Sequence, residues 1–173
     1  IDPGQQKSQM TEEEPVGPGA SATVAKMSYG ATSTTTGKRE YEWSMIFSKR
    51  LEAELIARGY EVVLTREKHD VKISNAERAQ FVNESGADVL ISIHQNSLPQ
   101  HPGVSGAQVF YNSAASAGPL ASAVQDALNQ SINDRAKLSK SIDPGIYLMK
   151  EVPCPAILAE CGFLSNSSET QLL

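Results

Sequence analysis

The sequence predicts an α/β fold, in which a mostly parallel sheet carries helices on both faces. Segments typical of strands alternate along the chain with segments typical of helices. Residues 88–93 form a nearly continuous apolar run, as in a strand that is covered on both faces. The chain has 173 residues, which is enough for one sizeable core and too few for two. We therefore expect a single domain.

Three helices are predicted. Over residues 38–57, apolar side chains recur every four positions, namely Trp43, Phe47, Leu51 and Leu55. Gly59 is placed to end this helix. Ser74 and Glu77 form a capping box that begins a second helix, which reaches about residue 84 and is closed by Gly86. Residues 120–132 form the third, with an apolar face made by Leu120, Val124, Ala127 and Leu128.

Further strands are predicted at residues 61–66, 107–111, 145–149 and 156–159, and residues 1–4 are typical of the last residues of a strand. Residues 11–37 show neither a helix nor a strand period and are rich in Gly, Ser, Thr and Pro. A flexible linker is one interpretation. Because strand-like residues precede the segment, we favour a long loop within the domain, and such loops are frequently functional.

The chain begins on a strand-like segment, and a new helix-start signal appears at residues 167–169, just before its end. We therefore expect residues 1–173 to be one catalytic domain that is truncated at both ends. A targeting segment could have been lost with the missing part.

Composition excludes two classes of function. The net charge is −5, and no basic stripe is present, so nucleic-acid binding is not expected. No apolar run approaches the roughly 18–20 residues of a membrane span, so none is expected in this fragment. Cys154 and Cys161 are too few for a disulfide framework and are interpreted as buried free thiols.

Several polar residues follow the predicted strands. Gln5 follows the first strand, Arg66 the second, His94 the third and Glu160 the last. In open parallel sheets, ligands bind beyond the carboxyl ends of the strands. These side chains are therefore candidates for a common site.

Glu40 reaches the same region from a helix. It lies in the first turn of the helix over residues 38–57, and its spacing from Trp43 and Phe47 puts its carboxylate on the buried face. The helix dipole stabilises an anion at this end. A carboxylate that faces inward requires a cation or a hydrogen-bond donor.

Taken singly, His94 and Glu160 have ordinary structural interpretations, as a hydrogen-bonded histidine and a salt-bridged carboxylate. Glu160, however, ends a very apolar strand, which disfavours the ionised carboxylate and should raise its pKa toward the range of a general base. The imidazole of His94 and the carboxylate of Glu40 suit zinc, and a further carboxylate nearby can take the proton from metal-bound water.

Six segments together resemble the zinc-dependent N-acetylmuramoyl-L-alanine amidases, which are bacterial cell-wall hydrolases. The resemblance spans nearly the whole chain, in order and at suitable spacing, and the long segment at residues 11–37 is most similar to the sporulation and germination-type members. The segments are Ile1-Asp-Pro-Gly4, the helix start at Glu40, Leu64-Thr-Arg66, Asn75-Ala-Glu-Arg78, Ser92-Ile-His-Gln-Asn-Ser97 and Glu160-Cys-Gly-Phe-Leu-Ser-Asn166.

The resemblance implies a twisted, mostly parallel sheet and cleavage of the amide between the lactyl group of N-acetylmuramic acid and L-alanine of the stem peptide. By position, it implies that Glu40 and His94 are ligands of one zinc ion and that Glu160 is the catalytic carboxylate. Peptidoglycan as substrate implies extracytoplasmic action, in the cell wall, secreted or spore-associated. Whether a regulatory protein partner binds this domain is left open. For Arg66 we expect a structural ion pair near the site.

Position 5 departs from the family pattern. The family places a histidine, the first zinc ligand, directly after Asp-Pro-Gly, whereas this chain has Gln5. Either Gln5 replaces that histidine, or a histidine is missing between Gly4 and Gln5. A carboxamide oxygen is a weaker zinc ligand than an imidazole nitrogen. The other histidines, His69 and His101, are interpreted as surface residues. His101 is close enough to His94 in sequence to be a remote candidate for the missing zinc ligand.

Three hypotheses therefore stand. The first is an active zinc amidase. The second is an inactive amidase-like domain that still binds peptidoglycan. The third is another enzyme on the same fold. No nucleophilic Ser or Cys paired with a His in the sequence supports this third hypothesis.

Overall fold

The protein is described by a computed structural model that covers residues 1–17, 19–142 and 145–172. Residue 18 of the expected loop and the last residue of the expected domain lie outside this description. The central sheet has five strands in the order β1-β4-β7-β5-β6. Their bounds are β1 Asp2–Pro3, β4 Leu90–Asn96, β5 Gln108–Tyr111, β6 Lys140–Ser141 and β7 Ala156–Phe163.

Most pairings in this sheet are parallel. β4 pairs in parallel with both β1 and β7, and β5 pairs in parallel with β6. The exception is β5, which runs antiparallel to β7. The expectation of a mostly parallel sheet is confirmed, and β6 is an edge strand that the sequence did not indicate.

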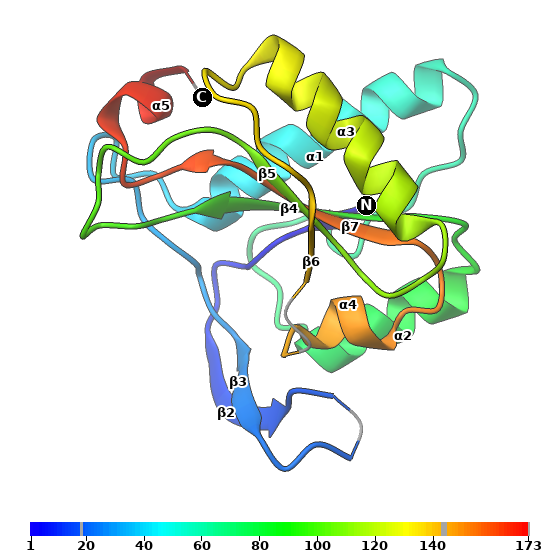
Figure 1. The fold of residues 1–173 in the computed structure, drawn as a ribbon. Coiled ribbons are helices and arrows are strands. Elements are labelled where there is room, and N and C mark those ends of the chain that lie inside the picture. The colour runs from blue at the N-terminus through cyan, green and yellow to red at the C-terminus, as the bar shows by residue number, and fades with distance from the viewer. Residues whose placement is uncertain (18, 143–144, 173) are drawn as a thin grey trace.

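Helices cover both faces of the sheet (Figure 1). α1 (Glu40–Ala57) and α3 (Ala117–Ser131) lie on one side, and α2 (Asn75–Ser85) and α4 (Tyr147–Glu151) on the other. The alternation along β7 explains this layering. Ala156 and Leu158 pack with α2 and α4, whereas Ile157, between them in sequence, packs with α3. α5 (Ser167–Leu172) follows β7 and agrees with the helix-start signal at residues 167–169.

The predicted helices are confirmed, with small changes of their ends. The capping box of α2 is formed, because the Ser74 hydroxyl accepts from Glu77 N at 3.1 Å and the Glu77 carboxylate accepts from Ser74 N at 2.7 Å. Gly86 ends α2 in the left-handed conformation, with φ 64°. α3 begins at Ala117, three residues earlier than predicted. No helix among the described residues is long and apolar enough to cross a membrane.

The interpretation of residues 11–37 as one long loop is wrong. β2 (Met10–Pro15) and β3 (Thr23–Met27) pair antiparallel and form a hairpin that projects from the domain (Figure 1). We call residues 10–27 the hairpin arm. Its strands pair only with each other and are mostly exposed, so they leave no alternation of apolar and polar residues in the sequence.

Two predicted strands are not formed. Residues 61–66 run beside β1, but only two backbone hydrogen bonds join them, from Ile1 N to Val63 O (2.7 Å) and from Thr65 N to Ile1 O (3.1 Å). Residues 145–149 contribute instead to α4, whose Leu148 and Met149 are buried. A short apolar run does not distinguish a strand from a helical turn, because both bury such residues.

The cysteines agree with the absence of a disulfide. Cys154 and Cys161 are both free, but each is partly buried rather than fully enclosed.

A buried ion pair fixes β1 to the rest of the domain. Arg78 Nη1 of α2 lies 2.7 Å from Asp2 Oδ1, and both side chains are 2% exposed. Asp2 also accepts hydrogen bonds from the hydroxyls of Ser92 and Thr65, each at 2.6 Å. Burial by itself would raise the pKa of Asp2, but Arg78 and the two hydroxyls outweigh it and hold the pKa well below its usual range.

The expected ion pair of Arg66 is wrong. Within the described part of the chain no carboxylate lies in salt-bridge range of its guanidinium, which donates instead to backbone carbonyl oxygens. Its partners include Pro3 (2.9 Å), Gly4 (3.1 Å) and Tyr41 (2.8 Å). These oxygens lie at the end of β1, directly after it and in α1, so Arg66 ties the two segments together.

We expect Asp2→Asn to destabilise the protein by about 3–5 kcal/mol, because Arg78 would keep a buried charge without its partner. Since the folded-state pKa of Asp2 is depressed, its contribution is complete above the unfolded pKa of about 3.9 and is lost as pH falls further. Urea unfolding at pH 7 and pH 3 tests both statements. The difference between wild type and Asp2→Asn should shrink at pH 3, and a constant difference would contradict the role given to Asp2.

Candidate active site

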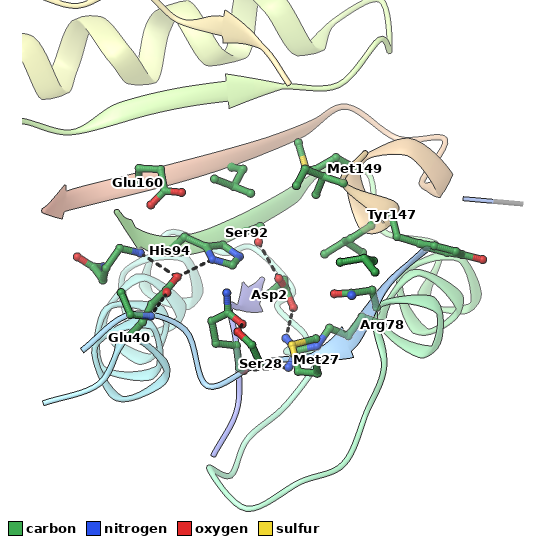
Figure 2. Close-up of a pocket in the computed structure, with 18 of the residues that line it drawn as sticks. Asp2, Met27, Ser28, Glu40, Arg78, Ser92, His94, Tyr147, Met149 and Glu160 are labelled. Atoms are coloured by element: carbon green, nitrogen blue, oxygen red, sulfur yellow. Dashed lines mark hydrogen bonds and ion pairs between the residues drawn. The ribbon is translucent and has the colours of Figure 1, made fainter. Parts of the chain in front are cut away.

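Glu40, His94 and Glu160 lie close together (Figure 2), whereas Arg66 does not line the same cavity. His94 in β4 and Glu160 in β7 are direct register partners on neighbouring parallel strands. Both lie inside their strands rather than just after them, because β4 continues to Asn96 and β7 to Phe163. Glu40, the first residue of α1, reaches the same place.

Glu40 and His94 form a close pair. Glu40 Oε1 lies 2.8 Å from His94 Nδ1, and the Glu40 side chain is 6% exposed. Backbone groups hold the carboxylate as well, since Gln95 N donates to Oε1 (3.3 Å) and Ala31 N donates to Oε2 (2.9 Å). The Glu40 carboxylate, which the helix spacing predicted to face inward, therefore has the His94 ring and two backbone N–H groups as partners.

The electrostatics of His94 follow from this pair. Burial opposes the charged imidazole, but the hydrogen bond and charge of Glu40, with a further contribution from Glu160, outweigh it. The pKa of His94 is thereby raised to about 9. A protonated ring can donate from Nδ1 to the Glu40 carboxylate.

Glu160 is a buried carboxyl with an unused oxygen. Burial raises its pKa to about 7, since the opposing effect of His94 is smaller and Glu40 adds to the rise. Its Oε2 has no hydrogen-bond partner among the described residues. A carboxyl that titrates near neutral pH and has a free oxygen is suited to general acid–base catalysis.

Gln5 lies beside this group in an unusual backbone conformation. Its φ is 59°, and it is the one non-glycine residue with positive φ in the described part of the chain. Ser28 Oγ donates to Gln5 Oε1 at 2.9 Å and itself accepts from Gly30 N at 3.0 Å. The carboxamide oxygen, the atom that could bind a metal ion, is therefore already engaged.

Gly30 lets one loop contact two candidate residues. Its φ is 74°, and an added Cβ would overlap the Glu40 carboxylate and lie 2.8 Å from Gln5 Cγ. Together with the bonds from Ser28 and Ala31, this close approach orients Gln5 and Glu40 from one segment. This segment could not be found from the sequence, since only the tertiary contacts distinguish it from other Gly- and Ser-rich turns.

The residues meet only part of the requirement for zinc. A catalytic zinc usually has three protein ligands, and Glu40 and His94 are good donors that face each other. Gln5 is at the position where the family resemblance implies a third ligand, and its side chain offers a weak donor that bonds to Ser28. Among residues 1–17, 19–142 and 145–172, no group of three His, Cys, Asp or Glu side chains is arranged to hold a metal ion.

The other two histidines lie elsewhere. The ring of His69 packs edge-on against Tyr41, with ring centroids 5.3 Å apart. His101 is exposed in the loop after β4. Neither residue lines the cavity at the site, so His101 does not take the place of the missing ligand.

The site opens into a cavity of about 430 Å³. Glu40, His94 and Glu160 lie at one end. Its other walls come from β3 and α4, as Met27, Tyr147 and Met149 show in Figure 2. These walls were not predicted from the sequence, because the residues of β3 were expected to form a loop and those of α4 a strand.

This arrangement defines an α/β enzyme domain whose candidate reactive groups, two carboxylates and an imidazole, lie together on β4, β7 and the start of α1. The comparisons with known proteins identify the family. The sequence model of the N-acetylmuramoyl-L-alanine amidases matches residues 1–173, so the chain belongs to that family.

Individual relatives agree with this membership. The chain is 35% identical over 130 residues to the germination-specific N-acetylmuramoyl-L-alanine amidase of Bacillus subtilis, a match that covers 75% of this chain and 52% of that protein. The chain thus spans about half the length of this relative. A solved N-acetylmuramoyl-L-alanine amidase of Clostridium difficile 630 has 28% identity and a TM-score of 0.78, over 99% of this chain and 82% of that one.

A second solved relative was determined together with another protein. It is the CwlD amidase of Clostridioides difficile in complex with the GerS lipoprotein, with 28% identity and a TM-score of 0.72. The match covers 83% of this chain and 80% of that chain.

We expect Gly30→Ala to destabilise the protein more than Gly37→Ala. Both glycines have positive φ, 74° and 71°, so each variant loses about 1–2 kcal/mol to backbone strain. An added Cβ meets nothing within 4 Å at Gly37 but overlaps Glu40 at Gly30, which adds about 1–3 kcal/mol. Urea unfolding of the two variants measures the difference, and equal losses would show that Gly30 is not confined by Glu40 and Gln5.

Proposed function

We propose that this domain hydrolyses the amide bond between N-acetylmuramic acid and L-alanine in peptidoglycan. The observation that carries the proposal is Glu160, a buried carboxyl with a pKa of about 7 and a free oxygen, beside the Glu40–His94 pair. Family membership supports the same reaction.

Glu160 has the properties of the catalytic base. In its ionised form, Oε2 can accept a proton from an attacking water and pass it to the leaving amine of L-alanine. A pKa near neutral serves both steps, because the same group must take up the proton and release it within one turnover.

Glu40, His94 and Gln5 are the residues that we propose as zinc ligands. When bound, zinc supplies Lewis-acid polarisation of a carbonyl oxygen. Binding would require His94 to lose its proton, so metal affinity should rise with pH. With Gln5 as the third donor, we propose that this chain retains zinc more weakly than a chain with three strong ligands.

A second candidate function is peptidoglycan binding without cleavage. The hydrogen bond between Ser28 and Gln5 Oε1 favours it, since a carboxamide held in this way is poorly available to a metal ion. On either function we propose extracytoplasmic action, in the cell wall, secreted or spore-associated. The GerS complex of a solved relative supports a protein partner, which we propose without naming it for this chain.

We expect Glu160→Gln to lower peptide release from peptidoglycan by about 10²–10⁴-fold, because the amide has the shape of the carboxyl but cannot take up a proton. Zinc content should stay unchanged. The exposed Glu61→Gln is the matched control and should keep full activity. A parallel loss of zinc in Glu160→Gln would show that Glu160 is a ligand and not the base.

We expect Gln5→His to raise zinc content and peptide release together. Histidine is among the residues that tolerate positive φ, so the backbone at position 5 can accept it. Gln9→His adds a histidine at an exposed position and controls for non-specific metal binding. If Gln5→His changes neither quantity, position 5 is not part of a metal site.

The same experiment separates the two candidate functions. Wild-type protein that binds peptidoglycan fragments but releases no peptide, with or without added zinc, supports the binding domain. Measurable release that follows zinc content supports the amidase.

A further inference from the structure

The hairpin arm is attached to the domain by a buried carboxylate. Glu14 of β2 is 6% exposed, and it accepts hydrogen bonds from the backbone of α2, from Asn75 N at 3.0 Å and Ala76 N at 3.4 Å. The positive end of the helix dipole stabilises this anion. Asn75 Nδ2 donates in turn to Lys26 O of β3 at 2.9 Å. Both strands of the arm are thus fixed to the start of α2.

The tip of the arm approaches α4. Gly17 is buried, and a Cβ added to it would lie 2.5 Å from Lys150 Nζ. The arm therefore contacts the start of α2 through Glu14 and Lys26, and Gly17 in its turn lies against Lys150 of α4. Since β3 and α4 are also opposite walls of the cavity, these contacts hold the two walls at a set separation.

The walls between these contacts are apolar. Met27, Leu148 and Met149 are buried, whereas Val24 and Ile146 are each 41% exposed at residues that line the cavity. Exposed apolar side chains on both walls of one cavity are typical of a ligand site.

Several polar groups of the floor are already paired. Asp2 binds Arg78 and Ser92, and the side-chain amide of Asn75 binds the backbone of β3. Arg78 Nε and the side-chain amide of Gln95 have no partner among the described residues, but these atoms are buried, so neither group offers an accessible partner to a sugar ring. Aliphatic groups gain free energy by leaving water for such walls.

We propose that the hairpin arm and α4 form an apolar subsite for the peptide part of the substrate, with Glu14 as the positioning residue of the arm. The proposal rests on the proposed function, because the cavity joins this subsite to Glu160 and His94. A substrate whose amide lies at Glu160 extends along the cavity, and its peptide side chains can fill the space between Val24 and Ile146.

The test measures the Kd of a soluble N-acetylmuramoyl-pentapeptide and, separately, of a peptide-free glycan fragment. We expect Val24→Ser and Ile146→Ser each to weaken pentapeptide binding about fivefold, as loss of one or two buried methyl groups implies. Glycan binding should stay unchanged. Val104→Ser and Ile132→Ser remove exposed apolar residues outside the cavity and should match wild type.

Glu14→Gln tests the attachment of the arm, and Glu13→Gln is its matched control. Glu13 is exposed and bonds only within the arm, to Thr23 Oγ1 at 2.6 Å. We expect Glu14→Gln to raise the Kd and KM for the pentapeptide severalfold with little change in kcat, and Glu13→Gln to change neither. A role of Glu14 in stability alone would lower the unfolding midpoint and leave KM unchanged, which would overturn its positioning role.

The outcomes separate this proposal from the proposed function. If wild type neither binds nor cleaves the pentapeptide, the proposed function fails. If wild type binds it and the Val24 and Ile146 variants bind equally well, the subsite is wrong. If these variants lose affinity for the glycan fragment as much as for the pentapeptide, the subsite does not bind the peptide part specifically, and this assignment is wrong. Both residues are partly exposed, so their variants should fold even if Glu14→Gln does not.

Discussion

The ion pair between Asp2 and Arg78 is the interaction on which the geometry of the site depends. It lies at 2% exposure, where an unpartnered charge would cost several kcal/mol, so the two side chains must stay together. Arg78 also donates to the carbonyl oxygens of Pro3 and Gln5. Because Arg66 binds the carbonyl oxygens of Pro3 and Gly4, two guanidinium groups determine the path of the chain just after β1.

This path explains the conformation of Gln5. β1 has only two residues, so its own ladder with β4 cannot orient the residues that come after the strand. The bonds from Arg78 and Ser28 supply that orientation and stabilise a positive φ that glutamine rarely adopts. Strain of this kind persists only where the surroundings determine the backbone, and it is concentrated at functional sites. Gln5 is therefore held beside Glu40, at the position where we propose a metal ligand.

The hairpin arm links this site to the far wall of the cavity. Its second strand ends at Met27, and the chain continues directly into Ser28, Gly30 and Ala31, which contact Gln5 and Glu40. One segment thus contributes both to the apolar wall and to the orientation of the reactive groups. A displacement of β3 on substrate binding would therefore also move the residues that orient Gln5 and Glu40.

The sequence by itself determined the mostly parallel sheet around β4 and β7, the main helices and the choice of candidate reactive groups. Continuous apolar strands, the capping box at Ser74 and the spacing of Glu40 from Trp43 are local signals that burial imposes on any chain of this fold. Only the tertiary structure decided the hairpin arm, α4 and the engagement of Gln5 by Ser28. Most residues of the arm are exposed and α4 is very short, so neither leaves a period in the sequence, and contacts between distant residues carry no local pattern.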